Sequence, residues 1–213
     1  MKILTKLFAT ATLLSVASLA HADPLLCSSG AAYEGSLDES DVTWEGSDAD
    51  DCYGAVDGND SASAVGDAFG GIWEELTKAD DIGDSPVTST GSYMGVDFEL
   101  TSDNGTSGDW TLSWAENTAG ALPLTLDFTV GIKGADSYGL WFFDDITFAS
   151  DPNTGTGTWS IGWENNGGNI PNISHFTLYV REGTTTVAEP GTLALLGFGL
   201  FGLGYARRRR AAS

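Results

Sequence analysis

Two short acidic clusters in the first third of the chain combine the oxygen ligands that calcium prefers. They read Asp-Ala-Asp-Asp and Asp-Gly-Asn-Asp, and their candidate ligands are Asp48, Asp50, Asp51, Asp57, Asn59 and Asp60. Ca²⁺ is bound by carboxylate and carbonyl oxygens on flexible loops. Neither cluster has the glutamate that an EF-hand loop carries at its twelfth position, so a solvated acidic loop is the alternative reading. We expect no other cofactor.

Few residues of the chain are arranged for catalysis. His175 lies in an alternating strand pattern and not in a loop that could present a mobile base, which disfavours a hydrolase triad. A glycosidase needs only two carboxylates, and the candidates are Asp144 and Asp145 with Glu164. Because a strand end with two aspartates is more often a solvated edge, we expect that the protein is not an enzyme.

Seven tryptophans raise the alternative of carbohydrate binding, because exposed indole rings stack on sugars. Four of them fall on the same strand face as their apolar neighbours, which places them in the core: Trp110, Trp114, Trp159 and Trp163. We therefore expect these rings to be buried. Carbohydrate binding, or less favoured carbohydrate cleavage, stays open as the second function.

The elements that must position these residues are short strands. Apolar residues alternate with polar ones over 96–100, 110–114, 122–132, 159–163 and 176–180, and an unbroken apolar run covers 140–143. Period two predicts antiparallel strands with one wet face, and the unbroken run predicts a strand covered on both faces. The expected fold is all-β, an antiparallel β-sandwich of jelly-roll or immunoglobulin-like type. A small twisted barrel is the second choice. Helix is expected only over Ala68–Ala79, with strand as the alternative, and Ser36–Asp67 is expected to be mostly loop.

The N-terminus has the organisation of a signal peptide. Lys2 and Lys6 precede an apolar run, and Ala20-His21-Ala22 supplies the small residues that signal peptidase needs. We expect cleavage before Asp23, so that residues 1–22 are the signal peptide and 23–186 the exported domain.

The exported domain is strongly acidic. Residues 23–186 contain 29 acidic and three basic residues, a net charge of −26. Such a surface repels nucleic acid and anionic membrane and attracts divalent cations. A nucleic-acid partner is therefore excluded.

The C-terminal residues 187–213 form a tail of three parts: the motif Glu189-Pro190-Gly191, an uncharged segment over 191–206, and the cluster Arg207, Arg208, Arg209 and Arg210. Sixteen residues at about 1.5 Å each cover roughly 24 Å, enough for one transmembrane helix in a thinned bilayer. The arginines belong on the cytoplasmic side, which places the preceding domain outside.

This tail resembles the PEP-CTERM sorting signal of Gram-negative bacteria, which the membrane enzyme exosortase recognises. Ala188 stands where the family usually has a first proline. The resemblance implies transient anchoring in the inner membrane, then a place at the outer surface or in the extracellular matrix, with exosortase and signal peptidase as processing partners. An ordinary C-terminal anchor is the alternative. Gly157-Thr158-Trp159, Asn165–Gly168 and Pro171–Tyr179 also resemble a pattern of all-β PEP-CTERM surface proteins.

The chain has two cysteines, Cys27 and Cys52. In an oxidising compartment an isolated pair predicts a disulfide, which would stabilise the fold by about 3 kcal/mol. Together these features predict an exported surface or matrix protein with a structural or interaction role and no catalysis. The alternative is a module that binds the exopolysaccharide.

Overall fold

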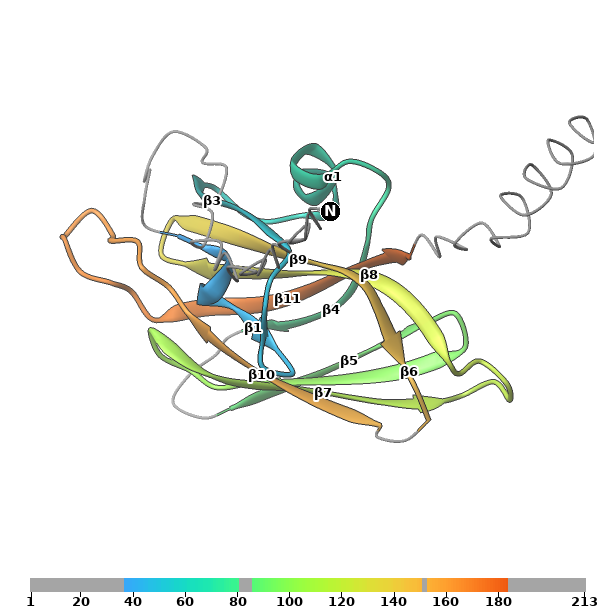
Figure 1. Ribbon diagram of the computed structural model, residues 1–213. Helices are drawn as coiled ribbons and strands as arrows, with labels where there is room; N and C mark the ends of the chain where they lie inside the picture. The colour runs from blue at the N-terminus through green and yellow to red at the C-terminus, as the bar shows by residue number, and fades with distance from the viewer. Residues whose placement is uncertain (1–36, 81–85, 151–152, 184–213) are drawn as a thin grey trace, which may run out of the picture.

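The computed structural model describes residues 37–80, 86–150 and 153–183, in which the two larger of three antiparallel sheets pack face to face (Figure 1). The five-stranded sheet has the order β3-β9-β8-β11-β4, and its strands are β3 (Asp51–Asp57), β4 (Glu74–Asp80), β8 (Leu124–Gly134), β9 (Ser137–Phe148) and β11 (Ile173–Glu182). The four-stranded sheet has the order β10-β7-β6-β5, and its strands are β5 (Val87–Tyr93), β6 (Val96–Ser102), β7 (Ser107–Glu116) and β10 (Thr154–Ser160). The predicted all-β sandwich is confirmed.

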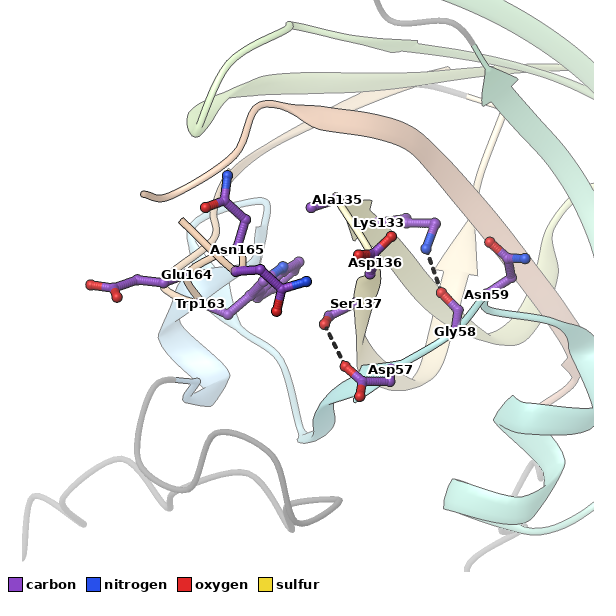
Figure 2. A pocket seen from close by; sticks show the side chains of 11 residues that line it. Asp57, Gly58, Asn59, Lys133, Ala135, Asp136, Ser137, Trp163, Glu164 and Asn165 are labelled. Carbon is purple, nitrogen blue, oxygen red and sulfur yellow. Dashed lines mark hydrogen bonds between the residues drawn. The ribbon is translucent and has the colours of Figure 1, made fainter. Parts of the chain in front are cut away.

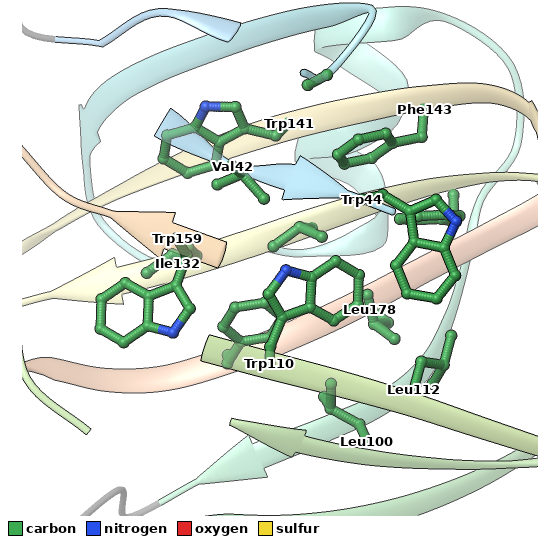
Figure 3. Close-up of a cluster of buried hydrophobic side chains, with 14 of the residues drawn as sticks. Val42, Trp44, Leu100, Trp110, Leu112, Ile132, Trp141, Phe143, Trp159 and Leu178 are labelled. Atoms are coloured by element: carbon green, nitrogen blue, oxygen red, sulfur yellow. The ribbon is translucent and has the colours of Figure 1, made fainter. Parts of the chain in front are cut away.

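Aromatic side chains fill the space between the two sheets (Figure 3). The ring centroids of Trp44 and Trp110 lie 4.9 Å apart, and those of Phe128 and Phe143 lie 4.7 Å apart. All seven tryptophans are at most 6% exposed. The four tryptophans that the alternation placed in the core are therefore buried, as predicted: Trp110, Trp114, Trp159 and Trp163. Their burial removes large apolar surfaces from water and holds the sheets together.

Both long edges of the sandwich are closed, one by a contact between the two sheets and the other by a hairpin. On one edge β4 meets β5, where the hydroxyls of Thr77 and Ser89 lie 2.6 Å apart. Gly91 allows this approach, because a Cβ there would lie 1.9 Å from the carbonyl oxygen of Leu76. On the other edge the hairpin of β1 (Thr43–Trp44) and β2 (Ser47–Asp48) lies beside β10.

Helix α1 (Ala62–Phe69) covers the outer face of the five-stranded sheet (Figure 1). Its N-cap is Ser61, whose hydroxyl accepts a hydrogen bond from the Ala64 amide. The predicted helix over Ala68–Ala79 was wrong: it overlaps only the last turn of α1, and residues 74–80 form β4. The alternative of a strand there was the right one.

The segment over Ser36–Asp67 is more regular than predicted. Besides the start of α1, it contains a 3-10 turn at Glu39–Asp41 and the strands β1, β2 and β3. Its many Asp, Gly and Ser residues favour loops by propensity, but β3 pairs with β9 and buries Cys52 and Ala55. Tertiary pairing overrides the local preference.

Strand β8 is buried on both faces, whereas its alternation predicted a wet face. Thr129 is fully buried, and Asp127 is 1% exposed. That face is covered by Arg181, by Trp73 and by helix α1, so the polar residues of β8 are buried beneath them. The unbroken run over 140–143 lies in β9, which is buried on both faces as predicted except for the partly exposed Phe142.

Within the described ranges, no helix combines the length and apolar character that crossing a membrane requires. The predicted signal peptide (1–22) and the predicted transmembrane segment (191–206) lie outside those ranges.

Candidate functional site

A polar cavity of about 490 Å³, called the edge pocket below, opens at one end of the sandwich (Figure 2). Three chain segments line it: the end of β3, the hairpin between β8 and β9, and the loop after β10. The lining residues are Asp57, Gly58, Asn59, Lys133, Ala135, Asp136, Ser137, Trp163, Glu164, Asn165 and Asn166. Its volume falls in the range that is usual for small-molecule sites.

Hydrogen bonds fix the wall made by β3 and the hairpin. The Ser137 hydroxyl donates to Asp57 Oδ1 at 3.1 Å, and the Gly58 amide donates to the Asp136 carbonyl at 2.7 Å. Lys133 Nζ donates to the Gly58 carbonyl (Figure 2). The only basic residue of the pocket is therefore already bonded to the backbone.

The opposite wall is a loop organised by one asparagine. Asn165 Oδ1 accepts hydrogen bonds from the amides of Gly167 and Asn169 at 2.9 and 3.2 Å. Trp163 anchors the loop, because its indole N–H donates to the Gly134 carbonyl at 3.1 Å and its side chain is buried. Asn166, the next residue of this anchored loop, also lines the pocket, while Glu164 points away from the other labelled side chains (Figure 2).

A buried polar network adjoins the pocket wall at residue 60. The Asp60 carboxylate accepts a hydrogen bond from the Tyr179 hydroxyl at 2.8 Å and contacts His175 Nε2. Burial opposes ionisation of Asp60, but the hydrogen bond and charge of His175 and the Tyr179 hydroxyl outweigh it and lower its pKa. Both carboxylate oxygens of Asp60 are thus used inside the protein.

A second acidic group, called the Asp127 cluster below, consists of Asp127, Asp144 and Asp145. One ligand atom from each lies within 4.8 Å of the others, which makes this the one group of three possible metal-binding side chains in the described ranges. Arg181 Nε donates to Asp127 Oδ2 at 2.7 Å. Partial burial, and then the neighbouring charges of Asp127 and Asp145, raise the pKa of Asp144. These carboxylates can hold a divalent cation.

The structure separates the calcium ligands that the sequence suggested. Asp48, Asp50 and Asp51 do not form a converging group. Asp50 instead accepts a hydrogen bond from the Asp144 amide at 2.8 Å, which brings it to the Asp127 cluster. Asp57 and Asn59 line the edge pocket. Sequence reasoning missed Asp127, because a polar residue in the alternation of β8 reads as solvent-facing.

Of the carboxylates considered for glycoside cleavage, Asp144 and Asp145 meet in the Asp127 cluster, but Glu164 does not join them. Glu164 lines the edge pocket, where β9 begins at Ser137. Asp144 follows seven residues along that strand, about 23 Å away at the usual strand rise. Paired catalytic carboxylates lie about 5 to 9 Å apart, so Glu164 and Asp144 cannot act together on one bond.

A second hollow, of about 600 Å³ and called the sheet hollow below, lies on the outer face of the four-stranded sheet. It is lined by residues of β5, β6 and β7, among them Ser92, Asp97, Glu99 and Ser113, together with Asn153. Asp97 is engaged there, because Oδ1 accepts hydrogen bonds from Ser92 and Asn117 at 2.5 and 2.6 Å.

The predicted sorting residues Glu189, Pro190, Gly191 and Arg207–Arg210 lie outside the described residues, as does Cys27. Cys52 is fully buried in β3, and the described part of the chain contains no free cysteine. The pairing of Cys52 with Cys27 stays a prediction.

The described residues therefore form an antiparallel β-sandwich domain with a polar pocket at one end. Residues 186–210 match the family described as the PEP-CTERM protein-sorting motif, so the chain is a PEP-CTERM motif-containing protein. The motif marks an exported protein of a Gram-negative bacterium with exosortase as processing partner. No curated protein and no solved structure is significantly similar to the chain.

Proposed function

We propose that this protein is a cell-surface or extracellular-matrix component with a structural or interaction role and no catalysis. The observation that carries the proposal is the sorting motif at residues 186–210. In this account the signal peptide (1–22) directs export, the segment over 191–206 anchors the chain transiently in the inner membrane, and exosortase then releases it to the surface.

The direction of the chain supports an interaction role for the edge pocket. Strand β11 begins beside the pocket, where Ile173 pairs with Gly134, and ends at Glu182, one residue before the described chain stops on its way to the sorting motif. Ten strand residues span about 30 Å. The pocket therefore lies at the end of the sandwich opposite to the end of β11.

Two features favour a non-catalytic role. The His175 ring is buried and contacts Asp60 and Asp80, so it is not presented to a substrate. Glu164 lies at the edge pocket, beside the start of β9, whereas Asp144 lies seven residues further along that strand. Carbohydrate binding is the second candidate function, and the polar edge pocket is the observation that favours it.

Cell fractionation tests the sorting claim. In a host with exosortase, the wild-type chain is expected to leave the inner membrane, whereas the double variant Glu189→Ala/Pro190→Ala is expected to stay there because the motif is lost and the anchor is not. The matched control is Glu182→Gln, which changes an acidic residue outside the motif and should leave with the wild type. If wild-type and double variant both remain in the inner membrane, the tail is a plain anchor and the proposal falls.

A further inference from the structure

The edge pocket is built for a ligand larger than a single metal ion. Asp57, Asp136 and Glu164 line it but do not bring ligand oxygens within 4.8 Å of one another, unlike the Asp127 cluster. A cation needs several oxygens at about 2.3 to 2.6 Å from one point. The cavity of about 490 Å³ instead has room for a small organic molecule or a unit of a polymer.

The lining of the pocket offers hydrogen-bonding groups and charges and no open aromatic face. Trp163, its one aromatic residue, is 1% exposed and is bonded through its indole N–H to Gly134, so no open ring face is offered for stacking. Carboxylate, amide and hydroxyl groups make up most of the remaining side chains. Such a lining suits a ligand with many hydroxyl groups and is unsuited to an apolar one.

The charges of the pocket restrict the class of ligand further. Asp57 and Asp136 face the space between the walls, and Lys133, the only cation there, donates to the Gly58 carbonyl (Figure 2). The formal net charge of the chain is −21. An anionic polysaccharide would therefore be repelled, while a ligand that carries an ammonium group would gain charge-assisted hydrogen bonds.

We propose that the edge pocket binds an amine-bearing saccharide of the glucosamine type, as a unit of an extracellular polymer. The ammonium group lies between the carboxylates of Asp57 and Asp136, and the ring hydroxyls pair with the amides of Asn59 and Asn166. The proposal rests on the interaction role proposed above and names the ligand for it. It does not depend on how the tail is processed.

Titration calorimetry on the full-length chain in mild detergent tests the proposal with a glucosamine tetramer as the probe. The tetramer is expected to bind at least about tenfold more tightly than the N-acetylated tetramer, because acetylation removes the charged donor. Asp136→Asn and Asp57→Asn are each expected to weaken binding by about tenfold, the usual effect of one charge-assisted hydrogen bond. Thermal melts report whether each variant is folded.

Glu99→Gln is the matched control, because it removes one acidic charge from the sheet hollow and leaves the edge pocket intact. It should bind the tetramer as the wild type does. Equal binding of both tetramers, no binding of the glucosamine tetramer, or an equal loss in Glu99→Gln would overturn the proposal. Because the full-length chain is used, a failure of exosortase processing would leave this result unchanged, and the two failures are distinguishable.

Discussion

At the scale of single residues, two aspartates with shifted pKa values make the stability of the sandwich depend on pH. The side chain of Asp60 is fully buried and joins His175 and Tyr179 of β11 to the segment before α1. Its pKa is lowered in the folded state, so its contribution to stability is present above the unfolded value of about 3.9 and is lost as the pH falls through the folded value.

Asp60→Asn is expected to lower the free energy of unfolding by about 2 kcal/mol at pH 7, because a buried charged acceptor of two hydrogen bonds is lost. The difference from the wild type should shrink as the pH is lowered to about 3. Urea unfolding at several pH values measures both effects. Asp67→Asn, an exposed change on α1, is the control and should stay within about 0.5 kcal/mol of the wild type. A pH-independent difference would contradict this account of Asp60.

Desolvation and like-charge repulsion in the Asp127 cluster give the opposite dependence of stability on pH. The pKa of Asp144 is raised in the folded state, so ionising it at neutral pH costs stability, and that cost disappears below the unfolded value of about 3.9. Asp144→Asn should therefore raise the melting temperature at pH 7 by the equivalent of about 0.5 kcal/mol and leave it unchanged at low pH. Asp109→Asn, on β7, is the control. A lower melting temperature for Asp144→Asn at pH 7 would show that the charge is needed and not merely tolerated.

The same variant tests whether calcium binds. If the Asp127 cluster holds Ca²⁺, millimolar Ca²⁺ should raise the melting temperature of the wild type beyond the effect of NaCl at matched ionic strength, and less so in Asp144→Asn. Equal responses to the two salts would leave only screening of the chain's net charge of −21.

At the scale of elements, close backbone approaches join the two sheets. Gly91→Ala is expected to cost about 3 kcal/mol, because its Cβ would lie 1.9 Å from the Leu76 carbonyl oxygen and β5 would have to move away from β4. Thr90→Ala, whose side chain is exposed on the same strand, should have little effect. Chemical denaturation of the two variants checks the prediction, and equal stabilities would refute the role of this contact.

Strands could be predicted from the sequence where the alternation was clear. Phe98, Leu100 and Trp110 point inward because a period of two matches the strand repeat. Helix α1 could not be placed, because it is short, contains Gly66, and gains its stability by packing Val65 on the sheet. The apolar residues around Trp73 then resembled a helix, although this ring turns back and donates to the Gly70 carbonyl.

The edge pocket could not be predicted, because its walls come from segments far apart in the sequence. Asp57, Asp136 and Asn166 line the same pocket only because β3 pairs with β9 and the loop after β10 lies opposite them. Sequence patterns identified Asp57 and Asn59 as possible ligands, but they assigned them to a local calcium loop. A cluster of acidic residues in the sequence suggests possible ligands. Only the fold determines which of these residues line the same pocket.

At the scale of the whole molecule, the chain combines a sandwich, whose pocket lies at the end opposite to the end of β11, with a tail that carries the sorting motif. The central claim is that exosortase processes this tail at the motif within residues 186–210. Processing would separate the acidic domain from its apolar segment and its arginines. A tail that only anchors the chain would keep all three together.

Intact-mass measurement of the mature protein, purified from a host with exosortase and from the same host without it, tests this claim most directly. With exosortase we expect a chain that starts at Asp23 and lacks Arg207–Arg210. Without exosortase we expect a chain that starts at Asp23 and ends at Ser213. A chain that ends at Ser213 in both hosts would contradict the account.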